Sequence, residues 1–371
     1  MISFIAFVFS IVILVFIHEL GHYLAARSVG VKVEKFYIGF NLFGYALFKK
    51  QMNGTEYGIG WFPLGGYVKL AGMLDESLDT SASDVPKENQ LQYQSPLAKI
   101  WIMSAGVIMN FLLAIIIFSV VSFNNGVPEA SSDEPIIGNV SEDIMNVDGD
   151  FIKKTAAHKL GLKSGDKIIQ IDNVSINNWD DMSLAIRNKP DEIINVKWIS
   201  ESQIKEGSVR TDTVTTLIDY KIKTIGKLGI GPDIKIRELS FIEALLNGCM
   251  MTSDFLFQMV FSLYSLISGQ ISIEHLSGPL GIAQVAGDSA KAGFESLFYL
   301  IAILSINLGL VNILPIPGLD GGHIFITLIE VILRKDLTLN AKVAIQNIGM
   351  LFLLSLFILV MFNDVVRLFF N

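Results

Sequence analysis

The chain has 371 residues, of which 51% are hydrophobic and 17% are charged, and its formal net charge at pH 7 is −8. Soluble globular proteins carry about 25% charged residues, and the mean hydropathy of this chain is +0.51. The composition therefore excludes an ordinary soluble protein and indicates a membrane protein. The negative charge, without any lysine- or arginine-rich block, argues against a nucleic-acid partner. A single cysteine, Cys249, excludes an internal disulfide framework.

Apolar stretches in the sequence predict a polytopic α-helical membrane protein with about four transmembrane helices. A span needs about 20 apolar residues, and the stretches that meet this need are 2–24, 101–123, 294–314 and 348–362. The first stretch lacks a basic n-region and a small-residue cleavage site, so we expect a retained helix and not a signal peptide. Polar residues interrupt the fifth stretch, 241–267, which favours an amphipathic helix in the membrane interface.

Basic residues gather in the loop between the first two spans and in the short connection after the third. By the positive-inside rule these loops face the cytoplasm, and the long segment 124–239 then lies on the opposite side. That segment alternates β-rich runs with turn signals, which predicts a small folded domain. We expect four parts. They are residues 1–123 with the first two spans, the inserted domain 124–239, an interfacial helix and linker 240–293, and the last two spans 294–371.

Residues 18–22 read His-Glu-Leu-Gly-His, the pattern H-E-x-x-H. On a helix, residues four positions apart lie on one face, so the imidazoles of His18 and His22 can reach one metal ion. Glu19 then stands beside that metal to activate water. His18 comes about 16 residues after the start of the first span, or roughly 24 Å along a helix. Ionisable groups at such depth are costly and are functional candidates. The alternative is that the span ends before His18, leaving a polar interfacial cap.

A third protein ligand is needed to complete a catalytic zinc site, and the segment 312–323, Asn-Ile-Leu-Pro-Ile-Pro-Gly-Leu-Asp-Gly-Gly-His, offers one. Its two prolines break the third span, and backbone released at that depth must line a cavity or be buried in protein. Asp320 is then a carboxylate at membrane depth that needs a partner, for which zinc is suited. The alternatives are that Asp320 caps the next helix or that His323 is the ligand, and we rank both below Asp320.

The two motifs together resemble the site-2 protease family of intramembrane metalloproteases, most closely its bacterial regulator-of-sigma-E protease type. The segment 54–69 also resembles the family's membrane-associated β-hairpin, and the segment 104–110 resembles its second-span motif, with Val107 where proline is usual. The resemblance implies one Zn²⁺ per chain, held by the ligands His18, His22 and Asp320, with Glu19 as the catalytic base. It also implies that Asn312 and the edge-strand region hold substrate. The glycines of that region are Gly60, Gly65 and Gly66.

Segments 135–140 and 159–172, with Trp179, resemble a PDZ domain, which binds an extended peptide or a C-terminus by β-augmentation. The resemblance implies one inserted PDZ domain of α+β type on the extracytoplasmic, periplasmic side of a multi-pass protein of the bacterial inner membrane. It implies regulated intramembrane proteolysis of single-span membrane proteins, such as anti-sigma factors or signal-peptide remnants, in contact with membrane lipid.

Two other functions use similar features. A metal transporter also places histidine and carboxylate inside a helical bundle, but it needs ligands at several depths, and the other spans carry almost no ionisable groups. A catalytically inactive scaffold could bind peptides through the PDZ-like segment. The intact Glu19 argues against the scaffold, because retaining a metal requires only the ligands.

Overall fold

The computed structural model describes residues 1–41, 44–73, 85–145, 151–218, 221–270 and 277–369. Within them the chain divides into two compact units. The first unit comprises Met1–Phe123 and Ser240–Asn371, and the second comprises Asn124–Leu239.

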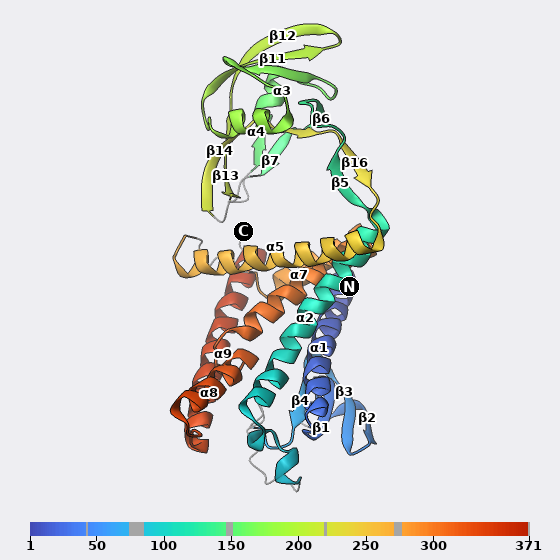
Figure 1. Cartoon of the computed structure of the whole chain (residues 1–371), viewed down its shortest axis with the longest axis vertical. Coiled ribbons are helices and arrows are strands. Elements are labelled where there is room, and N and C mark those ends of the chain that lie inside the picture. The colour runs from blue at the N-terminus through green and yellow to red at the C-terminus, as the bar shows by residue number, and fades with distance from the viewer. Residues whose placement is uncertain (42–43, 74–84, 146–150, 219–220, 271–276, 370–371) are drawn as a thin grey trace. The chain divides into compact units, whose positions relative to one another are not determined.

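Helices make up most of the first unit (Figure 1). They are α1 (Ile2–Ser28), α2 (Pro96–Asn125), α5 (Phe241–Ile267), α6 (Pro279–Ala292), α7 (Phe294–Ile313), α8 (Asp320–Leu333) and α9 (Leu339–Phe369), with two short 3₁₀ turns, Lys87–Asn89 and Leu91–Tyr93. Five of them, α1, α2, α5, α7 and α9, are long and apolar enough to cross a membrane. The prediction of a polytopic helical membrane protein is therefore confirmed.

The apolar pattern predicts four spans and an interfacial helix over 241–267, whereas five helices, α5 included, qualify as spans by length and apolar content. In Figure 1, α5 runs across the ends of α2 and α7 at a steep angle. It contacts α2 closely, because a Cβ atom on Gly248 would lie 2.1 Å from Ser119 Oγ. Phe255 of α5 stacks on Phe118 of α2 with ring centroids 5.6 Å apart. The polar residues of α5 find partners within the protein, as when Asn247 donates a hydrogen bond to Ser122 Oγ. Apolar length alone therefore does not distinguish an interfacial helix from a span here.

The buried positions of α1 form one stripe, which recurs every three or four residues, as expected for a helix packed on one side. The stripe contains Ala6, Phe7, Ser10, Leu14, His18, Gly21, His22, Ala25 and Ala26. Ala6, Phe7 and Leu14 join residues of α2, α6 and α7 in one core of the unit, and Ala25 and Ala26 join residues of α2 and the sheet in another. Both histidines of the H-E-x-x-H motif are therefore in register with the core-facing side of the helix.

A four-stranded sheet follows α1, in the order β2-β3-β1-β4. Its strands are β1 (Val33–Phe40), β2 (Ala46–Met52), β3 (Thr55–Gly60) and β4 (Phe62–Leu70). The prediction of a β-hairpin is right in kind, since β2 and β3 form one, but its bounds, 54–69, are wrong, because β1 lies between β3 and β4 and pairs with both of them. A hairpin loop usually has at least two residues, but only Trp61 separates β3 from β4. The chain instead crosses over the end of β1, where Gly39 has a φ of +77° and a Cβ atom would lie 3.0 Å from Gly60 O.

A tight turn joins α7 to α8 and places Asp320 at the first position of α8. A Cβ atom on Gly321 would lie 2.2 Å from Leu314 O, and one on Gly322 would lie 2.4 Å from Ile316 O. Only glycine allows α8 to begin this close to the preceding backbone. Helix α9 packs on the same turn, since a Cβ atom on Gly349 would meet the carbonyl oxygen of Pro317.

Helix α9 is held at its other end by Asp364, which is fully buried. The Asp364 carboxylate accepts hydrogen bonds from the backbone N–H groups of Gly278 at 2.9 Å, Leu280 at 2.9 Å and Gly281 at 3.0 Å. These groups open the first turn of α6, where helical N–H groups have no partner within the helix and favour negative charge. The carboxylate thus joins α9 to α6.

The second unit is a small α+β fold. Its strands are β5 (Val127–Ala130), β6 (Ile137–Val140), β7 (Asp143–Met145), β8 (Phe151–Lys153), β9 (Lys167–Ile171), β10 (Val174–Ser175), β11 (Ile193–Ser200), β12 (Gln203–Arg210), β13 (Asp212–Ile218), β14 (Lys221–Lys227), β15 (Ile230–Pro232) and β16 (Ile234–Arg237), and its helices are α3 (Ala156–Leu160) and α4 (Trp179–Arg187). The largest sheet has the order β10-β9-β11-β12, and the other strands pair two by two, β15 with β6 among them. A single core includes Ile137, Ile168, Met182 and Trp198.

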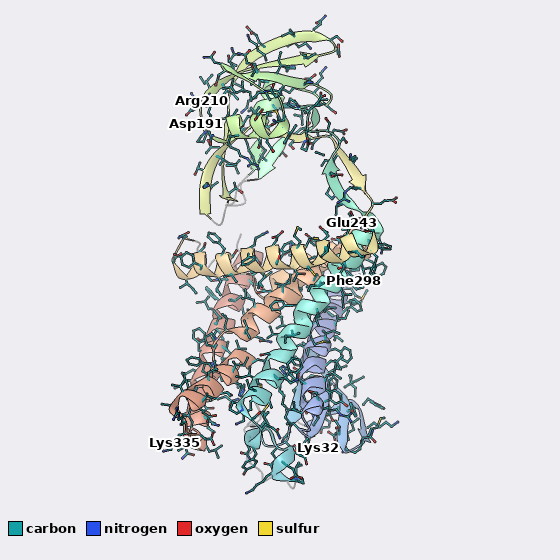
Figure 2. All side chains as sticks on the ribbon, viewed as in Figure 1. Lys32, Asp191, Arg210, Glu243, Phe298 and Lys335 are labelled. Atoms are coloured by element: carbon teal, nitrogen blue, oxygen red, sulfur yellow. The ribbon has the colours of Figure 1, made fainter. Side chains whose placement is uncertain are left out.

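Polar contacts fix the loops of this unit. Asp172 accepts a hydrogen bond from the backbone N–H of Asn195 at 2.7 Å and pairs with Lys189. The Asn195 N–H and the Lys189 ammonium hold the pKa of the Asp172 carboxyl below its usual range. In the same loop as Lys189, Asp191 pairs with Arg210 at 3.4 Å (Figure 2).

Candidate active site

Two helices bring His18, His22 and Asp320 together, although Asp320 comes about 300 residues after the histidines. The distance from His18 Nε2 to Asp320 Oδ2 is 3.2 Å, and that from His22 Nε2 to the same oxygen is 3.3 Å. The two Nε2 atoms lie 3.2 Å from each other. These are three donor atoms within 4.8 Å of one another, the spacing of a metal site.

Zinc fits this triangle. Zinc–nitrogen and zinc–oxygen bonds of about 2.0–2.1 Å in a tetrahedron place the ligand atoms about 3.3–3.4 Å apart, which matches the three separations. Asp320 Oδ2 is buried and has no hydrogen-bond partner among the described residues. A buried carboxylate oxygen without a hydrogen bond is costly, and a cation between the three donors would remove that cost. Three protein ligands leave a fourth position open, as catalytic zinc sites require.

A backbone carbonyl group and a side-chain amide contact the Nδ1 atoms of the two imidazoles, on the side of each ring away from Asp320. His22 Nδ1 lies 2.8 Å from the carbonyl oxygen of Ile102. Because a carbonyl oxygen only accepts, Nδ1 donates, and the lone pair of Nε2 is left to face Asp320. The side chain of Asn110 lies 3.1 Å from His18 Nδ1. The family resemblance of the segment 104–110 implies no role for Asn110. An amide on an otherwise apolar span was the signal for it.

Glycine lets α2 approach the two imidazoles. A Cβ atom on Gly106 would lie 2.5 Å from His22 Nε2 and 2.6 Å from His18 Cε1. From the other side, a Cβ atom on Gly21 would lie 2.4 Å from the carbonyl oxygen of Ala105. The helices α1 and α2 therefore touch through their backbones at the level of the histidines. Any larger residue at Gly106 would displace the imidazoles themselves.

Glu19 is half-buried and interacts electrostatically with both histidines and with Asp320. Its carboxylate accepts a hydrogen bond from the backbone N–H of Val68, in β4. In the described part of the sheet, β4 is an edge strand. A Cβ atom on Gly66 of β4 would lie 2.7 Å from Val15 Cγ1, one turn before Glu19 on α1. The edge strand and Glu19 are thus in direct contact.

The three glycines expected to bind substrate do not share one place. Gly65 and Gly66 lie on β4, against Phe40 and Val15 respectively. Gly60 ends β3, on the other side of β1, where a Cβ atom would lie 2.4 Å from the backbone of Phe40. Gly60 thus lies where the chain crosses over the end of β1 from β3 to β4, and not at the free edge of β4.

Asn312, in the last turn of α7, places its Nδ2 atom 3.2 Å from His18 Nε2, the nitrogen that faces Asp320. His323, one turn after Asp320, does not belong to the group of donor atoms found in the described residues. It lines a separate cavity of about 280 Å³ together with Thr327, Glu330 and other residues of α8 and α9. Asp320 does not cap α8, because the N-cap is Leu319 and no side-chain hydrogen bond caps that end.

The substitution Gly106→Ala should reduce zinc content severely while leaving the protein folded, since the added methyl group would occupy the space of both imidazoles. Zinc per chain, measured by mass spectrometry of the purified protein in detergent, checks this. Gly248→Ala is the matched control, because its methyl group would also meet a neighbouring helix but far from the histidines. Full zinc content in Gly106→Ala would contradict the described packing.

Comparisons with known proteins show the family of the chain. The model of the family described as "Peptidase family M50" matches residues 6–356. A Rickettsia conorii protein named "Putative zinc metalloprotease" is 34% identical to the chain, over 100% of the chain and 100% of its own length. A Campylobacter jejuni protein with the same description is 32% identical, over 99% of the chain and 94% of its own length. "Regulator of sigma-W protease RasP" of Bacillus subtilis is 29% identical over 98% of both chains. The chain is a metalloprotease and belongs to peptidase family M50, the site-2 protease family.

Proposed function

We propose that this metalloprotease hydrolyses peptide bonds of membrane-spanning proteins within, or at the edge of, the bilayer. The observation that carries the proposal is the convergence of His18, His22 and Asp320 inside a bundle of apolar helices. We assign these residues as the ligands of one zinc ion per chain. When bound, zinc supplies Lewis-acid activation of water and of the scissile carbonyl group.

Glu19 is the proposed general base, which takes a proton from the attacking water and passes it to the leaving amine. The hydrogen bond from Val68 N–H orients its carboxylate. Asn312 is within reach of the same space, since its amide lies 3.2 Å from His18 Nε2, and it is proposed to hold the substrate backbone. Both proposed roles rest on position, since Glu19 on α1 and Asn312 on α7 lie beside the proposed zinc ligands.

The proposed substrate site is the free edge of β4. A helix hides its peptide bonds, so cleavage requires an extended segment, and addition to an edge strand replaces the hydrogen bonds lost on unwinding. Gly65 and Gly66 lie along β4, next to the strand's contact with Glu19. An extended segment on this edge would pass beside the base. Gly60 supports this site indirectly, by allowing the chain to cross over to β4.

We propose four spans, α1, α2, α7 and α9, with α5 in the interface. Figure 2 places Lys32 and Lys335 at one end of the first unit, and Glu243 and Phe298 at the other. The positive-inside rule then assigns the end with the lysines to the cytoplasm. The second unit, which follows α2 and precedes α5, would lie outside the cytoplasm of a bacterial inner membrane. This arrangement fits the four sequence parts, 1–123, 124–239, 240–293 and 294–371.

The second unit is proposed to be a PDZ domain that binds an extended peptide with a free C-terminus. A cavity of about 610 Å³ lies between α4 and the segment that joins β14 to β15. Gly229 in that segment has a φ of +86°. The carbonyl oxygens of Leu228 and Gly229 accept hydrogen bonds from Ala157 and Ser141 at 2.7 Å and 2.8 Å. Their N–H groups have no partner in the described residues, and consecutive backbone N–H groups of this kind bind carboxylates.

Cleavage is proposed to serve regulated intramembrane proteolysis. The Bacillus subtilis relative is named a regulator of sigma-W protease, which supports single-span membrane proteins such as anti-sigma factors as substrates. Signal-peptide remnants share the same geometry of one apolar helix and are the second substrate class. The PDZ domain would bind the extracytoplasmic end of a substrate. The transmembrane helix of that substrate would reach the site through the surrounding lipid.

Glu19→Gln should abolish cleavage while zinc remains bound, because the proposed base and the proposed ligands are different residues. The measurement pairs zinc content with cleavage of a single-span model substrate by the purified protein in detergent. Glu34→Gln, on β1, is a control for charge removal in the same region and should leave cleavage intact. Turnover by Glu19→Gln above about 1% of wild type would refute the assignment of the base.

The groove of the second unit should bind a peptide with a free C-terminal carboxylate at least tenfold more tightly than its C-terminal amide, since the amide lacks the charge. Arg187 and Lys227 both line the cavity, so Arg187→Glu should weaken binding of the free acid. Arg210→Glu, in the same unit but not in the cavity lining, should leave it unchanged. Fluorescence anisotropy of labelled peptides with the full-length protein decides this, and equal binding of acid and amide would count against a carboxylate site.

A further inference from the structure

Asn110 is a fully buried amide on α2, beside the proposed metal ligand His18. Its Nδ2 atom lies 3.1 Å from His18 Nδ1. Its Oδ1 atom is buried and has no hydrogen-bond partner in the described parts of the chain. Nearly all buried polar atoms find a partner, so an isolated amide oxygen next to a ring nitrogen requires an explanation.

The proton of the His18 ring gives that explanation. His18 Nε2 lies 3.2 Å from both Asp320 Oδ2 and His22 Nε2, so this nitrogen faces the metal position. A nitrogen that binds a metal offers its lone pair, and a neutral imidazole then carries its proton on the other nitrogen. His18 Nδ1 is therefore a donor. In the arrangement with Nδ2 toward the ring, it would face a second donor.

Turning the amide by half a turn resolves the conflict, because the oxygen and nitrogen of an amide exchange places with almost no change in shape. Oδ1 then accepts the hydrogen bond from His18 Nδ1–H. In the orientation of the structure the outer atom, Oδ1, accepts no hydrogen bond from the described residues, so turning the amide gives up no bond to that oxygen, and the contact with His18 favours the turned orientation.

We propose that Asn110 is a positioning residue of the metal centre, whose Oδ1 accepts a hydrogen bond from His18 Nδ1–H and so fixes the ring and its tautomer. This inference rests on the proposed role of His18 as a zinc ligand. It gives His18 the same kind of support that His22 receives from the carbonyl oxygen of Ile102, 2.8 Å from His22 Nδ1. Acceptors behind metal-binding histidines keep the lone pair aimed at the metal.

Packing holds Asn110 in the required place. Ser305 Oγ of α7 donates a hydrogen bond to the carbonyl oxygen of Asn110 at 2.8 Å. A Cβ atom on Gly309, one turn further along α7, would lie 3.1 Å from the ring of Phe111 and 3.5 Å from the Cβ atom of Asn110. The amide is thus enclosed between α1 and α7, and its position relative to His18 is set by three helices.

The test measures zinc affinity of the full chain in detergent, by competition with a chromophoric chelator. Asn110→Leu has a similar size and no acceptor, so its zinc affinity should fall about 10- to 100-fold, as is typical for removing the partner of a metal-binding histidine. Asn110→Asp keeps an acceptor and has no N–H donor, so its affinity should stay within a few-fold of wild type. The two variants separate an acceptor role from a donor role and from general packing.

Ser119→Ala is the control, because it removes a hydrogen bond on the same helix, from Ser119 Oγ to the carbonyl oxygen of Ile115, but leaves the amide of Asn110 and its packing, so its zinc affinity should be unchanged. An Asn110→Leu affinity within about twofold of wild type would overturn the inference. So would an equal loss in Asn110→Leu and Asn110→Asp, which would mean that the amide donates to His18. If Asn110→Leu does not fold, the affinity of Asn110→Asp alone decides. His18→Ala must lose zinc in the same assay, and if it does not, the proposed ligand set fails instead.

Discussion

The rest of the structure depends on one constraint: two imidazole nitrogens and a carboxylate oxygen must stay 3.2–3.3 Å apart inside a helical bundle. Lipid offers no water to solvate such groups, so protein must supply every partner. Close backbone contacts between the helices hold these partners in place. Gly21 and Gly106 bring α1 and α2 together at the histidines, and Gly321 and Gly322 fold α8 back so that Asp320 faces them. Each glycine stands where a methyl group would open the site.

The site also links catalysis to the sheet. Val68 of the edge strand β4 donates its N–H to Glu19, so a segment added to β4 would be aligned with the base. This contact gives a physical reason for a sheet beside the proposed metal ligands. If the substrate is a transmembrane helix, as proposed, the enzyme would have to stabilise its extended form, and a free strand edge can do so. The same requirement is absent from a transporter, and membership of the M50 family selects the protease.

Sequence reasoning predicted the apolar helices and the residues that meet at the site, because both depend on local patterns: 3.6-residue periodicity around His18 and His22, and prolines before Asp320. It did not predict the order of the sheet, which depends on β1 inserting between β3 and β4, a long-range pairing with no local signal. It gave no role to Asn110 or Gly106 for a similar reason, since their functions depend on α2 lying against α1. Composition alone does not decide whether α5 spans the membrane, because an interfacial helix and a span can have similar residues and differ mainly in their direction relative to the bilayer.

The central claim is that Asp320, and not His323, completes a zinc site with His18 and His22. The most direct measurement is the zinc content per chain of purified wild type, Asp320→Ala and His323→Ala, by mass spectrometry. We predict about one zinc ion per chain in wild type and in His323→Ala, and almost none in Asp320→Ala, since a third protein ligand is required for tight binding. Full zinc in Asp320→Ala, with loss in His323→Ala, would contradict this claim.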